Sequence, residues 1–141
     1  MSNRSLAILF ARVTLGLIFF MAGWWKVFEL GSFEHARRMF VEPYADNWIP
    51  ATLLWASGSA VPVIELVAGA LLIIGWRIRE ASIALGAVLL LVTYGHLLKE
   101  PLYSFTGHVI PRLGLLLFVL WVPREEDRLS LDHWHARPRK A

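Results

Sequence analysis

The sequence contains no cysteine among its 141 residues. Without thiols the chain cannot form disulfides, bind zinc through thiolates, ligate an iron–sulfur cluster or perform CxxC redox chemistry by itself. It also lacks the GxGxxG, Walker, HExxH and nucleophile-elbow motifs. The sequence therefore gives no indication of a soluble active site, and no metal site is predicted.

Charged residues are scarce as well. They make up 18% of the chain, whereas hydrophobic residues make up 57%, and the mean hydropathy is +0.54. A soluble domain of this size carries about 25% charge, so the apolar excess indicates a protein embedded in lipid. The net charge is +3, and the basic residues lie mostly beside apolar runs. This arrangement suits anionic lipid head groups, and we expect membrane lipid and no nucleic acid as partners.

Four apolar segments approach the roughly 20 residues that a helix needs to cross a bilayer. We predict an all-α, four-transmembrane-helix bundle that forms a single membrane domain over residues 1–141. The expected spans are at about 6–28, 51–75, 81–98 and 105–122, with an outer loop at 29–50 and a cytoplasmic tail at 123–141. The fourth span is the weakest, because His108, Pro111 and Arg112 occupy its first half. Glycines within the spans predict close helix contacts; they are Gly16, Gly23, Gly58, Gly69 and Gly86.

Basic residues in the loops set the expected orientation, because they accumulate on the cytoplasmic side of a membrane. One side of the predicted bundle carries only Arg37, Arg38 and Lys99. The other side carries the larger set, and we expect it and both termini to be cytoplasmic. That set is Arg4, Arg77, Arg79, Arg124, Arg128, Arg137, Arg139 and Lys140.

The first outer loop has an amphipathic pattern. Ser32 can cap a short helix that Pro43 would end. Such a helix would lie on the membrane surface or cover the bundle, although an ordinary connecting loop remains an alternative. Its apolar face would carry Phe33, Ala36, Met39 and Phe40, and its polar face Glu34, Arg37 and Arg38.

Ionisable residues inside the spans are the main candidates for function. A charge at a helix centre costs roughly 2.5–3.5 kcal/mol on insertion scales, so it usually has a partner. Arg12 in the first span and Glu65 in the second lie within an arginine's reach in depth, at about 1.5 Å rise per residue. We predict an Arg12–Glu65 ion pair, which either fixes packing or marks a proton or quinone site. Lys26, closer to the outer boundary, is expected to snorkel to the lipid head groups.

Two histidines mark the outer end of the predicted hairpin between the third and fourth spans. His96 ends the third span and His108 begins the fourth, so their imidazoles can lie at one height. A bis-histidine haem, a proton relay and interfacial histidines bonded to their neighbours are all open. We favour the last and do not expect haem, because two histidines alone are not diagnostic of haem ligation.

Short motifs in three regions resemble those of a known family. The first span carries Arg12-x3-Gly16 and Gly23-Trp-Trp-Lys26, the second carries Glu65-x3-Gly69-x5-Gly75, and the tail carries Ser130-Leu-Asp132. In order and spacing they resemble the DoxX family of small bacterial four-helix membrane proteins, over about residues 6–132. The chain departs from that pattern where a glycine-rich stretch usually precedes Ser-Leu-Asp, since here the sequence is Pro123-Arg-Glu-Glu-Asp127.

The resemblance implies a redox setting. Some DoxX relatives are membrane subunits of thiosulfate:quinone oxidoreductase, or associate with terminal oxidases or redox-stress complexes. We therefore expect a subunit of a quinone-linked oxidoreductase complex in the bacterial inner membrane, whether or not this chain is itself catalytic. Candidate quinone-binding residues are Arg12, Glu65, Trp24, Trp25 and Lys26, with the ring among Trp24, Trp25, Phe19 and Phe20; His96 and His108 are weaker candidates.

Two other functions remain open at this point. The protein could be a non-enzymatic assembly or anchoring factor that docks through its outer loop and tail. It could also be a small transporter or proton pathway built on Glu65, His96 and His108. The expected partners are other membrane or redox-complex subunits, or further copies of the chain, because four helices leave little room for a pore in one copy.

Overall fold

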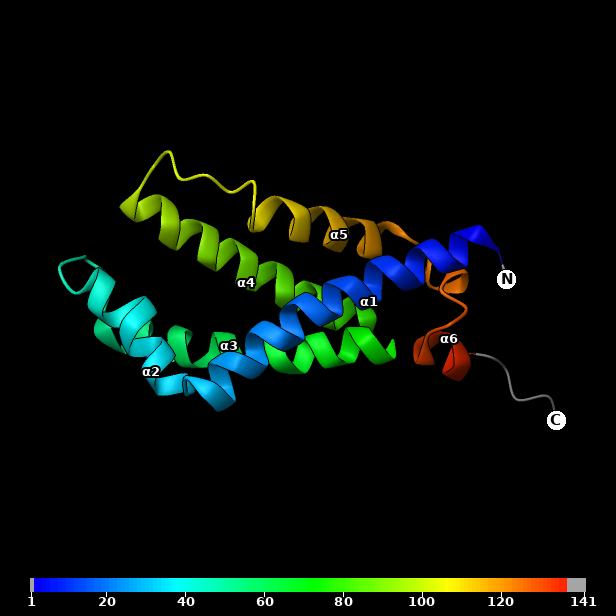
Figure 1. Ribbon diagram of the computed structural model, residues 1–141, viewed down its shortest axis with the longest axis horizontal. Coiled ribbons are helices and arrows are strands. Elements are labelled where there is room, and N and C mark those ends of the chain that lie inside the picture. The colour runs from blue at the N-terminus through cyan, green and yellow to red at the C-terminus, as the bar shows by residue number, and fades with distance from the viewer. Residues whose placement is uncertain (1, 137–141) are drawn as a thin grey trace.

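The computed structural model describes residues 2–136, which contain helices and no strands (Figure 1). This confirms the all-α prediction. Four long helices run back and forth: α1 (Asn3–Trp24), α3 (Ala51–Ile74), α4 (Ile78–Lys99) and α5 (Val109–Trp121). Helices α1 and α4 each contact both α3 and α5, so the four close into a ring. Arg137, Arg139 and Lys140, part of the predicted cytoplasmic set, lie outside the described residues, as does the side chain of Arg124.

Three of the four helices are long and apolar enough to cross a membrane. They are residues Asn3–Glu29, Ala51–Ile74 and Ile78–Lys99, whereas α5 has 13 residues. The fourth span was predicted to begin at Phe105, but residues 105–108 form turns in which the Phe105 carbonyl accepts from the N–H groups of Val109 and Ile110. Pro111 then falls in the first turn of α5, where its missing N–H costs little.

The first span is longer than predicted at its inner end and changes geometry at its outer end. Ser2 caps α1 by accepting a hydrogen bond from the Ser5 N–H at 3.2 Å. After Trp24 the helix widens into a π-helical segment, η1 (Trp25–Glu29), and it stops before Gly31, whose φ is +88°. A residue without Cβ adopts this conformation at little cost.

A short helical segment follows η1 and packs against α3 (Figure 1). It comprises α2 (Ser32–Ala36), η2 (Arg37–Val41) and η3 (Glu42–Tyr44), and we call it the outer segment. The sequence predicts Ser32 as the N-cap of this helix, whereas Gly31 is the N-cap and Ser32 is the first residue of α2. The expected apolar face is only partly buried, because Ala36 is buried whereas Phe33 and Met39 are exposed.

A proline inside α3 explains why the outer segment docks where it does. Pro62 has no N–H, so the carbonyl of Gly58 lacks its usual partner within the helix. The buried His35 supplies the missing bond, with Nδ1 2.8 Å from the Gly58 oxygen. Gly58 also admits the segment closely, since a Cβ there would lie 2.7 Å from the Cα of Ala36. Pro62 and Gly58 thus create a docking point for α2.

Helices α1 and α3 touch through their backbones. A Cβ on Gly23 would lie 2.4 Å from the Leu66 nitrogen, and one on Gly69 would lie 2.5 Å from the Phe20 nitrogen. Gly16 faces Gly69 in the same way, with a built Cβ 2.9 Å from the Gly69 oxygen. Small residues of this kind permit close helix approach in lipid. Gly86 was expected to do the same, but its nearest neighbour is a Leu116 methyl group at 3.8 Å.

Candidate functional site

Two separate ion pairs lie within the bundle, at opposite ends. Arg12 Nε lies 2.9 Å from Asp127 Oδ2, and Lys26 Nζ lies 2.5 Å from Glu65 Oε2. The predicted Arg12–Glu65 pair is therefore wrong. Arg12 is level with Leu72, seven residues from Glu65 along α3, which separates the two by about 10 Å along the helix axis.

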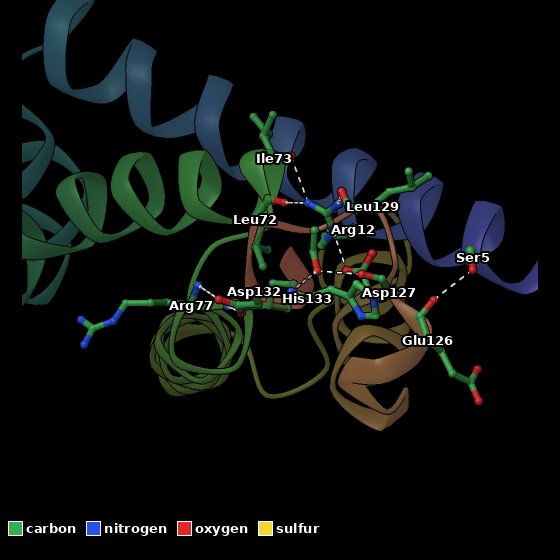
Figure 2. Close-up of polar contacts among 12 residues, drawn as sticks. Ser5, Arg12, Leu72, Ile73, Arg77, Glu126, Asp127, Leu129, Asp132 and His133 are labelled. Atoms are coloured by element: carbon green, nitrogen blue, oxygen red, sulfur yellow. Dashed lines mark hydrogen bonds and ion pairs between the residues drawn. The ribbon is translucent and has the colours of Figure 1, made fainter. Parts of the chain in front are cut away.

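Arg12 closes the inner end of α3 (Figure 2). Its side chain is fully buried, and its guanidinium donates to the Leu72 carbonyl and, at 3.0 Å, to the Ile73 carbonyl. These carbonyls belong to the last turn of α3, which lacks N–H partners within the helix and carries the negative end of its dipole. A further bond of 3.2 Å reaches the Leu129 carbonyl in the tail. Arg12 thus joins α1, α3 and the tail.

The Ser-Leu-Asp motif completes this junction. The Asp132 carboxylate accepts from the N–H groups of Arg77 and Ile78, both at 2.9 Å, and so caps α4 (Figure 2). Ser130 caps the short helix α6 (Leu131–Ala136) by accepting from the His133 N–H at 3.1 Å. The tail lies directly on the α3–α4 turn, because a Cβ on Gly75 would come within 2.7 Å of Ser130 Cβ.

We call Arg12, Asp127, Ser130 and Asp132 the inner cluster. Burial raises the pKa of the Asp127 carboxyl, and the neighbouring Arg12 opposes that shift. The guanidinium of Arg12 donates three hydrogen bonds to carbonyls, and its Nε forms an ion pair with Asp127, so these contacts tie it to the chain itself. The inner cluster is therefore a tail latch, and the structure does not place Arg12 beside Glu65 in a ligand site.

The outer half of the bundle holds the larger cavity, of about 420 Å³, which we call the outer cavity. It lies beneath the outer segment, against η1, α3 and α4. Apolar and aromatic side chains dominate its walls, while Lys26, His35 and His96 add polar groups. The walls include Trp25, Phe40, Tyr44, Val61, Leu91 and Tyr103.

A smaller cavity of about 160 Å³ adjoins it, and we call this the polar cavity. The Lys26–Glu65 pair forms part of its wall, together with His96, His108 and Arg112. The two cavities share four lining residues, namely Lys26, Val92, His96 and Tyr103. The structure thus brings six of the predicted candidates to the walls of these two cavities: Phe19, Trp25, Lys26, Glu65, His96 and His108.

Two other expectations are corrected by the geometry. Trp24 does not line either cavity; it is 43% exposed and packs against Phe28 in a tilted arrangement with ring centroids 4.5 Å apart. Lys26 does not snorkel outward, because its amine turns to Glu65 and its side chain is only 22% exposed. Successive residues of a helix are rotated by about 100° around its axis, so the neighbours Trp24 and Trp25 point to different surroundings.

Three site residues were missed by the sequence reasoning: His35, Tyr44 and Tyr103. Pro62 was a usable signal for His35, because an internal proline leaves a carbonyl that needs a donor. Tyr44 donates from its hydroxyl to the Gly95 carbonyl at 2.6 Å, and burial raises its pKa. Tyr103 stacks near His96, with centroids 4.4 Å apart. Nothing in the local sequence pattern indicates either tyrosine contact.

Comparison with known proteins agrees with the motifs. The family model described as DoxX matches residues 7–97. The chain belongs to the DoxX family. The match contains Arg12, Lys26, Glu65 and His96, and it ends before His108 and the Ser130-Leu-Asp132 motif. No curated protein and no solved structure matches the sequence. This DoxX protein is thus shown to be a small, helical membrane protein with three to four apolar helices.

The inner cluster predicts a strong coupling between Arg12 and Asp127. Arg12→Gln should cost about 3–5 kcal/mol of stability, because it leaves a buried carboxylate and several carbonyls without their partner. Asp127→Asn should restore part of that loss in the double variant. The stability of the native protein, the two single variants and the double variant is measured by thermal unfolding in neutral detergent. Additive losses in the double variant would contradict the buried pair, and Arg79→Gln, an exposed arginine at the same end, is the matched control.

The His35 bond predicts that docking of the outer segment depends on pH. Burial lowers the pKa of His35 from its usual 6.5, and nearby Lys26 adds to this, against the opposing hydrogen bond to Gly58 and the Glu65 charge. An undocked His35 binds its proton more readily, so docking is fully stable above pH 6.5 and weakens as the pH falls below it.

Hydrogen exchange of residues 32–44 from pH 7.5 to 5, corrected for the intrinsic rate, measures this effect. Protection should fall on acidification in the native protein and stay level in His35→Gln, which keeps an uncharged donor. Equal pH dependence in both proteins would rule out His35 as the group responsible.

Proposed function

We propose that this DoxX protein is a membrane subunit of a quinone-linked oxidoreductase complex and that its outer cavity holds the quinone ring. The observation that supports the proposal is the combination of aromatic walls with charged and polar groups in one cavity inside an apolar bundle. At about 420 Å³ it falls in the size range of sites for small organic ligands, which are mostly apolar with a few polar groups.

The residues present fit the chemistry of a quinone. A quinone ring needs flat apolar walls, which Trp25, Phe40 and Tyr103 can provide. Its carbonyl oxygens need donors. Lys26 donates one of its three N–H groups to Glu65, which leaves two for a quinone oxygen. The Tyr103 hydroxyl makes no hydrogen bond within residues 2–136 and is a further donor.

Proton transfer is the other requirement, because a bound quinone takes up or releases protons together with electrons. His96 donates from Nδ1 to the Val92 carbonyl at 2.8 Å, which leaves Nε2 as the acceptor in the neutral ring. Glu65, paired with Lys26, is a second titratable group and lines the adjoining polar cavity. His96 and His108 both line the polar cavity and thereby lead from Glu65 towards the outer end.

The proposed location is the bacterial inner membrane, with both termini in the cytoplasm. The start of α1 and helix α6 lie at one end of the bundle, and the outer segment lies at the other (Figure 1). Exposed Arg4, Arg77, Arg79 and Arg128 belong to the first end, as basic cytoplasmic residues would. The outer cavity would then open near the far face of the membrane.

The alternatives find less support in the geometry. A transport path through one copy would have to pass the core between the polar cavity and the inner cluster, where Leu15, Leu72 and Leu85 are fully buried. An anchoring role would use the outer segment or tail as a docking surface, but both are held by contacts to the bundle itself. A ligand site accounts for the aromatic walls of the outer cavity, which neither of these two roles requires.

Quinone binding by purified protein in lipid nanodiscs tests the proposal. A short-chain benzoquinone should bind in a saturable manner, and Lys26→Gln should weaken it about tenfold or more, since hydrogen bonds to charged groups contribute roughly 1.5–3 kcal/mol. Glu65→Gln should also change the affinity, because it releases Lys26 from its ion pair.

Arg79→Gln, at the opposite end of the bundle, is the control and should bind as the native protein does. The proposal fails if the native protein binds no quinone, or if Lys26→Gln binds it equally well. Retention of a redox partner by a native complex, with no quinone bound to this subunit, would favour the anchoring function.

A further inference from the structure

Arg112 carries a positive charge into the polar cavity without a carboxylate partner. It is half-buried, and in the part of the chain that the structure describes it forms no ion pair or hydrogen bond. Its one recorded partner is the ring of the buried Phe19, whose centroid lies 5.7 Å from the guanidinium carbon. A cation over an aromatic face is attracted to it, but the ring does not cancel the charge.

The position of Arg112 in its helix adds to the positive potential. It lies in the first turn of α5, where the helix dipole is positive and favours a negative group. That turn contains no acidic residue, and its N-cap residue, His108, makes no side-chain cap. Both the helix dipole and the Arg112 guanidinium therefore favour an anion at the start of α5.

The other charges around the two cavities cancel in pairs. Lys26 neutralises Glu65 in direct contact, and Lys99 and Glu100 balance each other at the rim of the outer cavity. Arg112 is left as one formal positive charge in excess. An unpaired charge within a membrane protein is costly, and a bound anion would offset that cost.

The shape of the site indicates what kind of anion would fit. The polar cavity is about 160 Å³ and lies beside the larger, mostly apolar outer cavity, with which it shares Lys26, Val92, His96 and Tyr103 as lining residues. A small charged group fits the first and an apolar chain fits the second. The planar guanidinium of Arg112 matches the paired oxygens of a carboxylate or phosphate.

We propose that Arg112 binds the single negatively charged head group, carboxylate or phosphate, of an amphiphile whose chain occupies the outer cavity. This site does not depend on the quinone proposal. The two ligands would share the outer cavity and would therefore compete for it, but only the amphiphile needs Arg112.

Calorimetric titration of the full-length protein in neutral detergent tests the site, with dodecyl phosphate as the probe. The native protein should bind it at one saturable site, and Arg112→Gln should bind at least tenfold more weakly. Arg112→Lys keeps the charge without the planar fork and should fall between the two. Arg128→Gln, an exposed arginine at the opposite end, should match the native protein. Gel filtration and thermal unfolding establish that each variant is folded.

Three results would overturn the proposal or part of it. Equal binding by the native protein and Arg112→Gln, or no binding by either, removes the anion site. If inorganic phosphate binds as tightly as dodecyl phosphate, the anion site stands but the alkyl chain does not occupy the outer cavity. If dodecanoate binds as tightly as dodecyl phosphate, the proposal of an amphiphile with either head group is supported. The short-chain benzoquinone is titrated into the same variants. If folded Arg112→Gln binds the benzoquinone as the native protein does, the quinone site and the anion site can be judged independently.

Discussion

The backbone contact between α1 and α3 is the constraint on which the rest of the structure depends. Gly16, Gly23 and Gly69 remove the side chains that would hold the two helices apart, so the register between them has little freedom. That register sets Arg12 level with the end of α3 and Lys26 level with Glu65. Two ion pairs at opposite ends of the bundle follow from this one packing arrangement.

The two ends then differ in what their polar groups contact. At the inner end Arg12, Asp127 and Asp132 bind to one another's segments and cap two helices, so the tail belongs to the folded bundle. At the outer end the Lys26–Glu65 pair lines the polar cavity, and Arg112 lines the same cavity without a counter-charge. A chain whose polar groups contact one another at one end and line cavities at the other has its space for a ligand at the second. This asymmetry favours the outer cavity as the functional site.

Hydropathy and motif spacing were enough to predict the helical bundle and the DoxX resemblance, because both depend on signals within single segments. The identity of ion-pair partners was not predictable in the same way. Arg12 and Glu65 seemed matched in depth, but their true separation depends on where the helices start and how they are staggered, which glycine contacts decide. Asp127 pairs with Arg12 only because the tail folds back onto the bundle.

The outer site illustrates the same limit. Lys26, Glu65, His96 and His108 were recognisable as polar residues in apolar surroundings, whereas Tyr44 and Tyr103 come from connecting segments with no periodic pattern. His35 is an intermediate case. Pro62 indicates that a carbonyl in α3 lacks its partner within the helix, but it does not indicate which loop residue binds that carbonyl. Loop residues enter a site through tertiary docking, and a local pattern does not encode that step.

Paired cysteine cross-linking in native membranes tests the register of α1 against α3 most directly, because the chain has no cysteine of its own. Lys26→Cys combined with Glu65→Cys should be joined efficiently by a short bifunctional thiol reagent. Arg12→Cys combined with Glu65→Cys should not be joined, because about 10 Å of helix separates the two levels. Cross-linking of the second pair in preference to the first would contradict the register, and with it the placement of the outer site.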